Sequence, residues 1–456
     1  MNKKRLILRI VIIVLAGVFL GIQLYSWNAR SLGGDKMPMP LGFATSVVLS
    51  GSMEPELQVN DMIIVTAKDS YGVGDVVVYQ SYGTLIVHRI ISIDGEAVIT
   101  RGDANQTPDP AIKLSDIKQI PGVTSIVWAL HNKMPGEVWE VEEIAEVQKQ
   151  LEPYGFNMDV VESVNVHDDI KVGLPTRDGY IANYIQTIKN LSKFGVKVIC
   201  YNFMPVFDWT RTDLFHPVGD GSTALYYEAS RIHDDPKEMA DYILNNLNGL
   251  TFPGWEPERM AKLDELFELY RPVTKEKLWE NLKYFLEAIM PTCKECDIKM
   301  AIHMDDPPWD IFGLPRLLTS GENVDRFLKM VDNPYNCVTL CSGSLNADPN
   351  NNVADIVRKH CDRIAFAHIR NVKHFDNGDF SEASHRDCDG DTGILEILKA
   401  YHDGGFEGYI RPDHGRHLWD EGPGNVRPGY GLYDRALGIM YMLGVWDMLD
   451  KLDGKN

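Results

Sequence analysis

The sequence predicts an α/β protein built on a parallel (β/α)8 TIM-type barrel, preceded by an apolar helix and a small β-rich segment. From about residue 117 onward, short continuous apolar runs alternate with helical segments, a pattern typical of parallel strands covered on both faces. Four of these runs carry a potential metal ligand near their end. Because such barrels place their active sites at the carboxyl ends of the strands, the pattern predicts an enzyme with a metal site.

Seven strands are predicted in the barrel region. They are Ser125–Leu130, Asp159–Val164, Val196–Asn202, Lys299–Asp305, Val338–Gly343, Ile364–Arg370 and a run that begins at Gly408. Helices are expected over Val138–Leu151 and Arg177–Phe194, and a helical insertion at about residues 211–295 fills the long interval before Lys299. A closed barrel has eight strands. Either Ala97–Arg101 supplies the eighth, or the barrel is open.

The ligand-bearing runs provide two imidazoles, one thiolate and one carboxylate. They end near His303, Cys341, His368 and Asp413. A single histidine in a strand is more often a packed core residue, and a single cysteine a small hydrophobe. Four ligand types at four consecutive strand ends favour a divalent transition metal instead, and the cysteine also suits zinc or iron.

Charge and cysteine usage exclude other classes of protein. Residues 1–118 are balanced in charge, so the remainder carries the whole net charge of −20, which is unsuited to nucleic acid. All seven cysteines lie at or after Cys200, and an odd number indicates a reducing compartment rather than a disulfide framework. The pair Cys293 and Cys296 is expected to be ordinary helix.

The N-terminus predicts a membrane anchor over residues 1–34. Basic residues precede the apolar run Leu6–Leu24, which is long enough to span a bilayer and favours a cytoplasmic N-terminus. A cleaved signal peptide is the alternative. Residues 35–116 then contain short β-type segments: Ser46–Leu49, Met62–Thr66, Asp75–Tyr79, Thr84–Ile93 and Ala97–Thr100.

Three strings in this first part carry a resemblance. They are Ser-Gly-Ser-Met-Glu-Pro from Ser50, Val-His-Arg-Ile from Val87 and Arg-Gly-Asp-Ala-Asn from Arg101. Together they resemble signal peptidase I of the type that uses histidine in place of lysine. The resemblance implies Ser52 as nucleophile, His88 as general base and Asp103, alone or with Asp109, as the orienting acid. It stops near Asp116, which predicts a truncated, membrane-anchored serine endopeptidase as the alternative function.

A second resemblance covers residues 117–456. The stretch Cys200–Leu214, the string Ile-His-Met-Asp-Asp-Pro-Pro from Ile302 and Leu-Tyr-Asp-Arg-Ala-Leu from Leu432 resemble mannonate dehydratases. This family implies a barrel related to the xylose isomerase group. It also implies a lyase that dehydrates D-mannonate to 2-keto-3-deoxy-D-gluconate in hexuronate (glucuronate) catabolism, with Mn2+ as the usual metal and Fe2+ as an alternative.

The second resemblance also implies roles for individual residues. His303, Cys341, His368 and Asp413 would bind the metal, Asp413 and Tyr430 would transfer protons with His414 beside them, and Arg370, Asn371 and Arg211 would contact substrate. Tyr433 is an alternative to Tyr430, and Asp305 and Asp306 are expected to support the ligands.

The expected partners are a small sugar acid and, through the N-terminal helix, a membrane; a homo-oligomer is compatible with the sequence. A barrel of this type is expected in the cytoplasm, whereas the anchor would place it outside. The two resemblances meet near residues 110–118, which fits either a fused gene product or an artefact of gene assembly.

Overall fold

The computed structural model describes residues 114–456 apart from 132, 233–262, 423–425 and 455–456. Before residue 114 it describes residues 39, 43–48, 53, 56–58, 61–66, 75–81, 84–94 and 97–101. The chain divides into two compact units, Met1–Asp109 and Pro110–Asn456. The predicted span Leu6–Leu24 lies outside the described residues. Among the residues that are described, no helix combines the length and apolar character needed to cross a membrane.

The described part of the first unit consists of antiparallel strands. β1 (Phe43–Val47) pairs with β2 (Met62–Thr66), and β4 (Thr84–Asp94) pairs with both β3 (Val76–Ser81) and β5 (Ala97–Arg101). The predicted strands are therefore confirmed, although β1 begins three residues before the predicted Ser46. The suggestion that Ala97–Arg101 closes the barrel is wrong, because β5 pairs with the strand just before it in sequence. A short antiparallel connection of this kind is local, whereas a parallel neighbour needs a long crossover.

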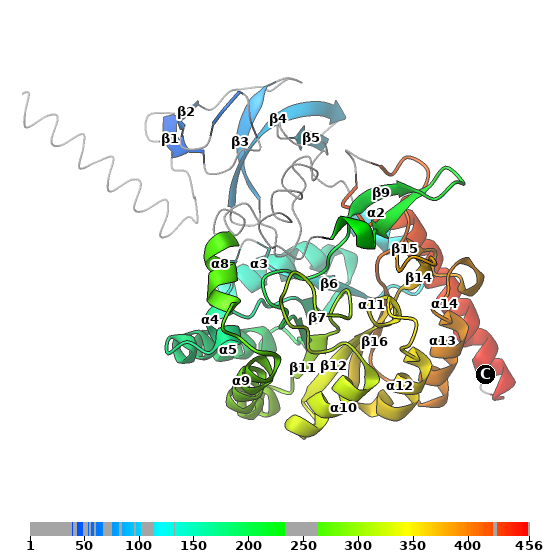
Figure 1. Ribbon diagram of the computed structural model, residues 1–456. Helices are drawn as coiled ribbons and strands as arrows, with labels where there is room; N and C mark the ends of the chain where they lie inside the picture. The colour runs from blue at the N-terminus through cyan, green and yellow to red at the C-terminus, as the bar shows by residue number, and fades with distance from the viewer. Residues whose placement is uncertain are drawn as a thin grey trace, which may run out of the picture. The chain divides into compact units, whose positions relative to one another are not determined.

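The second unit is built on a parallel sheet of seven strands, and each of them was predicted. They are β6 (Ser125–Trp128), β7 (Asn157–Glu162), β8 (Val198–Tyr201), β11 (Lys299–His303), β12 (Asn336–Cys341), β13 (Ile364–Ile369) and β16 (Tyr409–Pro412). Neighbours in the sheet are neighbours in the sequence, in the order β16-β13-β12-β11-β8-β7-β6. Among the described residues no eighth strand joins β16 to β6, so the sheet is curled but open (Figure 1).

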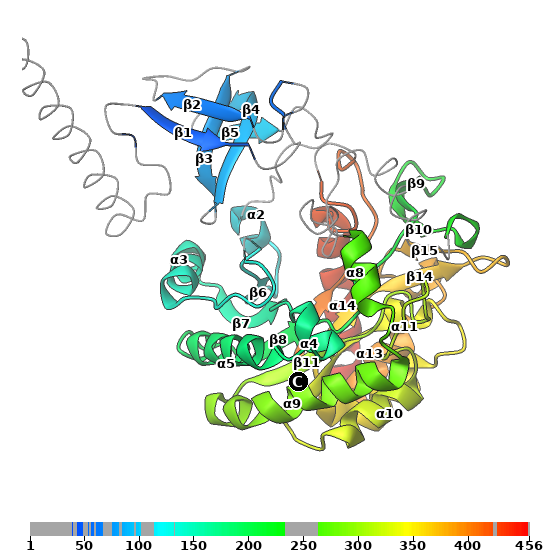
Figure 2. The ribbon, with the colours of Figure 1, turned by 60° about the vertical axis from the view of Figure 1, so that its left-hand side comes forward.

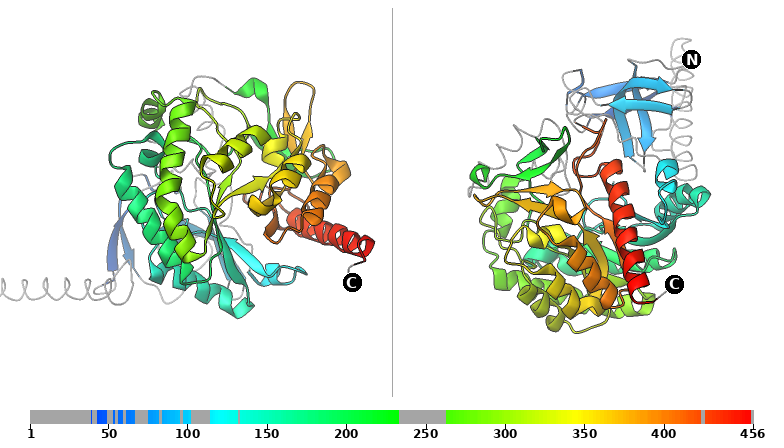
Figure 3. Two further views of the ribbon diagram at one scale, coloured as in Figure 1. Left: turned by 90° about the horizontal axis from the view of Figure 1, so that it is seen from below. Right: turned by 90° about the vertical axis from the view of Figure 1, so that its right-hand side faces the viewer.

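Helices lie on the outer side of the curled sheet, as both views in Figure 3 show. The helices that the structure describes in this unit are α2 (Leu114–Lys118), α3 (Val141–Leu151), α4 (Asp168–Val172), α5 (Arg177–Ser192), α8 (Leu263–Tyr270), α9 (Lys275–Cys296), α10 (Gly321–Met330), α11 (Ser342–Asn346), α12 (Val353–His360), α13 (Ile394–Asp403) and α14 (Leu432–Leu452). Figure 2 shows α5, α9 and α10 along one side. Thr274 caps the N-terminus of helix α9, because its hydroxyl accepts from the Lys277 N–H, and the helix contains Cys293 and Cys296 as expected.

Two hydrophobic cores follow from this arrangement. The larger lies between the sheet and its helices. The smaller fills the inside of the curl with Val160, Val198, Cys200, Ala301, Cys337, Ala365 and Phe366. Because side chains alternate along a strand, the next inward positions after Val160, Ala301 and Phe366 belong to Glu162, His303 and His368. The inner core thus supports polar groups at the carboxyl ends of the strands.

A four-stranded antiparallel sheet adds to the barrel, in the order β14-β15-β10-β9. Its strands are β9 (Asp213–Pro217), β10 (Thr223–Tyr227), β14 (Asn371–His374) and β15 (Phe380–Ala383). The segment predicted as a helical insertion therefore begins with a hairpin. Helix α9 is the barrel helix that leads into β11, and residues 233–262 of the predicted insertion lie outside the described residues.

Candidate active site

Strand register brings the predicted ligands together. Cys341 on β12 is the register partner of His368 on β13, and His368 in turn faces Arg411 on β16. The Asp413 N–H donates to the Ile369 carbonyl at 3.0 Å, which carries the chain past the end of β16 in line with the sheet. The predicted ligands therefore lie close together because their strands are parallel and the register places their carboxyl ends side by side.

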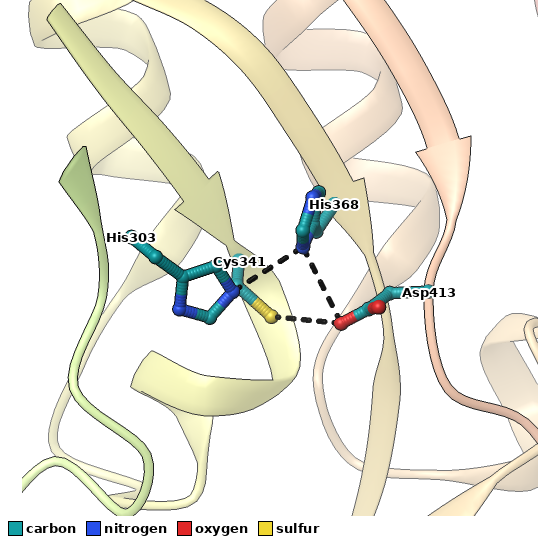
Figure 4. A group of neighbouring side chains, drawn as sticks. All are labelled: His303, Cys341, His368 and Asp413. Carbon is teal, nitrogen blue, oxygen red and sulfur yellow. Dashed lines mark hydrogen bonds and ion pairs between the residues drawn. The ribbon is translucent and has the colours of Figure 1, made fainter. Parts of the chain in front are cut away.

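The four side chains point toward one another in Figure 4, and their ligand atoms all lie within 4.8 Å of each other. His303 Nε2 lies 3.3 Å from His368 Nδ1, and His368 Nδ1 lies 3.4 Å from Asp413 Oδ2. The Cys341 thiol donates to Asp413 Oδ2 at 3.5 Å. Cys341, His368 and Asp413 are buried and His303 is half-buried.

The orientation of these groups fits a metal ion. His303 Nδ1 donates to the Met304 carbonyl at 2.6 Å, which leaves its Nε2 lone pair directed at the cluster. Two imidazole nitrogens, a thiolate sulfur and a carboxylate oxygen form a mixed donor set that suits divalent transition metals. The residues present therefore fit the metal-binding role expected from their types and spacing.

A buried network of charges lies behind the cluster. Arg370 donates through Nε to Asp413 Oδ2 at 2.9 Å and also pairs with Asp306. Arg211 donates to Asp306 at 2.7 Å and to Glu382 of β15 at 3.0 Å. Both guanidinium groups are almost fully buried among these carboxylates. The structure thus places Arg370 and Arg211 as partners of the protein's own carboxylates rather than on an open face.

Asn371, the third residue expected to contact substrate, is also engaged internally. Its amide nitrogen donates to the Ser384 and Arg386 carbonyls, each at 3.0 Å, and its oxygen accepts from the Thr392 N–H. With both amide N–H groups used, it holds the loop after β15. Asp305 and Asp306 are not among the clustered ligands: Asp305 accepts from the Leu317 and Leu318 N–H groups.

The more accessible side of the cluster contains two charged residues, Arg411 and Glu162, for which no role was predicted. Arg411 pairs with Glu162 Oε2 at 2.8 Å and with Asp413 Oδ1 at 2.7 Å. The side chains of Arg411 and Glu162 are 18% and 19% exposed. Burial raises the pKa of Glu162, but the charges of Arg411 and His368 lower it to about 2. Glu162 ends a strand just as the ligands do, and that position was the signal available in the sequence.

Tyr430 and His414 lie beside the cluster, as expected. Their rings are 4.7 Å apart in a T-shaped contact. Tyr433 instead contacts the exposed Trp419, so Tyr430 is the tyrosine at this site. His414 Nδ1 lies 2.8 Å from Glu382 Oε1. Burial raises the pKa of Tyr430 to about 12, and burial together with the Arg370 charge lowers the pKa of His414.

Of the three residues expected to form a peptidase triad, only His88 is among the described residues. Ser52 and Asp103 lie outside the described residues. His88 is buried on β4, where it is the register partner of Val77. The proposed triad therefore stays a prediction from the sequence.

A parallel α/β barrel with a mixed-ligand cluster at its strand ends is the arrangement expected of a metal-dependent enzyme. The family model described as D-mannonate dehydratase (UxuA) matches residues 105–456, and the chain belongs to this family of carbon–oxygen lyases. It is 61% identical over 338 residues to mannonate dehydratase 1 of Halalkalibacterium halodurans, covering 74% of this chain and 92% of that protein. It is 60% identical over 342 residues to mannonate dehydratase 1 of Bacillus licheniformis, covering 75% and 93%.

A solved structure supports the same assignment. The crystal structure of mannonate dehydratase from Streptococcus suis serotype 2 superposes with a TM-score of 0.67 at 41% identity. The match covers 76% of this chain and 93% of that one. A TIM-barrel-like fold is therefore confirmed for the second unit, although the described residues form seven of the eight strands of the predicted (β/α)8 barrel. Its specific relation to xylose isomerases stays a prediction.

Proposed function

We propose that the chain dehydrates D-mannonate to 2-keto-3-deoxy-D-gluconate, with the metal held by His303, Cys341, His368 and Asp413. The observation that carries the proposal is the convergence of these four side chains within 4.8 Å in a chain of this family. Mn2+ is the metal we expect from the family, and Fe2+ is the alternative, which the thiolate ligand itself suits better. A bound divalent ion supplies electrostatic stabilisation of the negative charge that develops on the substrate carboxylate.

Proton transfer is assigned to groups beside the ligands. Tyr430, with its pKa near 12, stays protonated at neutral pH and donates a proton to the departing C3 hydroxyl. Both oxygens of Asp413 already accept hydrogen bonds from guanidinium groups, which makes this carboxylate a poor acceptor for a substrate proton. We therefore assign Asp413 to metal binding and not to proton transfer. His414 is the better base for the C2 proton, because Glu382 engages its Nδ1 and leaves Nε2 for substrate. Loss of water gives an enol that rearranges to the 2-keto acid.

The substrate is proposed to approach from the side of the cluster that retains exposure. His303, Glu162, Arg411 and Tyr430 are half-buried there, whereas Arg211 and Arg370 are enclosed behind the ligands. Arg411 is therefore the guanidinium placed nearest to an incoming sugar-acid carboxylate.

The test is direct conversion of D-mannonate by the purified full-length chain supplied with Mn2+, measured by the appearance of a 2-keto acid. Tyr430→Phe should lower kcat by about 100-fold or more because it removes the general acid. Tyr433→Phe is the matched control and should leave the rate unchanged. A wild-type protein that forms no keto acid with either Mn2+ or Fe2+ would contradict the proposed function.

A further inference from the structure

The two histidines of the cluster are held by different kinds of partner. His303 uses its outer nitrogen, Nδ1, to donate to a backbone carbonyl at 2.6 Å. His368 turns its outer nitrogen, Nε2, toward the Glu162 side chain, whose Oε2 lies 3.4 Å away. The outer nitrogen of His303 is thus engaged by the main chain, whereas that of His368 faces a carboxylate without a hydrogen bond to it.

The outer nitrogen of His368 needs an acceptor. A neutral imidazole that binds a metal through one nitrogen carries its proton on the other. Here that nitrogen is buried, and the described residues offer it no aligned hydrogen bond. A buried N–H without an acceptor is unfavourable. Glu162 Oε2 faces it, and a small approach of the two side chains completes the bond.

Arg411 fixes the position of Glu162. It is the register partner of His368 on the neighbouring strand β16, so its guanidinium lies beside the imidazole. It bridges two carboxylates, Glu162 at 2.8 Å and the ligand Asp413 at 2.7 Å. Glu162 is therefore held in place by an ion pair, and the same cation connects it to the proposed ligand Asp413.

We propose that Glu162, held by Arg411, is a positioning residue that orients His368 with Nδ1 toward the metal. The proposal rests on the metal site of the proposed function. Carboxylates that accept the outer N–H of a ligating histidine fix both the tautomer and the ring orientation. Glu162 itself is not one of the clustered ligands, so its effect on the metal passes through His368.

The test is a Co2+ titration of the metal-stripped full-length chain, followed by the charge-transfer absorbance of the Cys341 thiolate. Glu162→Ala should weaken Co2+ binding by about 10–100-fold. Glu162→Gln keeps an acceptor oxygen at the same reach and should retain most of the affinity. Glu162→Asp keeps the charge but withdraws it by one methylene, so it should lose affinity. Glu143→Ala removes a carboxylate paired with Lys133 away from the cluster and should change nothing.

The outcomes separate the alternatives. Wild-type affinity and an unchanged spectrum in Glu162→Ala would overturn the proposal, as would a loss in Glu162→Gln as large as that in Glu162→Asp. If Glu162→Ala does not fold, as judged by circular dichroism, the Gln and Asp variants decide the question. A wild-type chain that binds no Co2+ would overturn the metal site itself and this proposal with it.

Discussion

The interior strands of the barrel and its two edge strands position their functional groups in different ways. β12 and β13 have paired neighbours on both sides and are buried at every residue. β6 and β16 pair on one side among the described residues, and only the last residue of each is fully buried. The interior strands supply Cys341 and His368, whereas Asp413 follows the edge strand β16.

The difference shows what holds each ligand. Cys341 is fixed by sheet register and by the start of α11 directly after it. Asp413, at the open edge, is instead held between the guanidinium groups of Arg370 and Arg411. Sheet pairing positions the first ligand, and buried ion pairs position the second. Removing a charged neighbour should therefore disturb Asp413 at the edge of the sheet more than Cys341 in its interior.

Cys341→Ala should produce the largest effect. It removes a ligand from the interior of the sheet without creating a charge, so metal affinity and turnover should fall by more than the roughly 100-fold seen for outer-shell changes. Cys337→Ala is the matched control, because Cys337 is buried on the same strand in the inner core. Equal turnover in the two variants, measured with saturating D-mannonate, would break the proposed distinction between ligand and core cysteine.

Arg370→Ala should be the most destabilising change on the edge side. It leaves Asp413 and Asp306 buried without their shared cation, which costs about 3–5 kcal/mol. Arg326→Ala breaks a solvent-exposed pair with Glu276 and should cost far less. Urea unfolding of both variants measures the difference. A cost for Arg370→Ala no greater than for Arg326→Ala would show that the edge does not depend on these ion pairs.

Substitutions of two isoleucines allow the packing of an interior strand and of an edge strand to be compared directly. Ile302 on β11 is buried, so Ile302→Ala should lower the free energy of unfolding by about 2–5 kcal/mol. Ile410 on β16 is only half-buried, and Ile410→Ala should cost less than half as much. The same unfolding experiment gives both values. Equal costs would indicate that β16 is covered as fully as β11.

Hydrogen exchange should show the smallest contrast. Amides in Asn336–Cys341 should exchange more slowly than those in Ser125–Trp128, because the former segment is buried and paired on both sides. Chelating the metal should speed exchange more in Tyr409–Asp413 than in Asn336–Cys341, since the edge ligand depends on side-chain contacts. Mass spectrometry of peptic peptides measures both. Uniform exchange across the sheet would contradict the comparison.

The sequence correctly predicted the features that local residue patterns encode, namely the barrel strands and the candidate ligands at their ends. Buried parallel strands are continuous apolar runs, and ligands at their ends are visible as His303, Cys341, His368 and Asp413 without knowledge of the pairing. The sheet of β9, β10, β14 and β15 was missed because its strands are short and two of them pair with partners about 150 residues away, such as Tyr226 with Ser381.

Charged residues near the site were harder to interpret. Arg211 and Arg370 have the residue type expected for binding a sugar-acid carboxylate, yet the fold surrounds them with Asp306, Glu382 and Asp413. Only three-dimensional structure shows which carboxylates neutralise which cations. Glu162, in contrast, was overlooked as a functional residue. A single acidic residue after an apolar run does not reveal that it faces an imidazole.

The location of a bound metal tests the central claim most directly. Crystals of the full-length chain grown with Mn2+ should give an anomalous difference peak within bonding distance of His303 Nε2, Cys341 Sγ, His368 Nδ1 and a carboxylate oxygen of Asp413. The same crystals of Cys341→Ala should lose most of that peak. A strong manganese peak elsewhere, with these four side chains unliganded, would contradict the assignment of the active site to the carboxyl ends of β11, β12, β13 and β16.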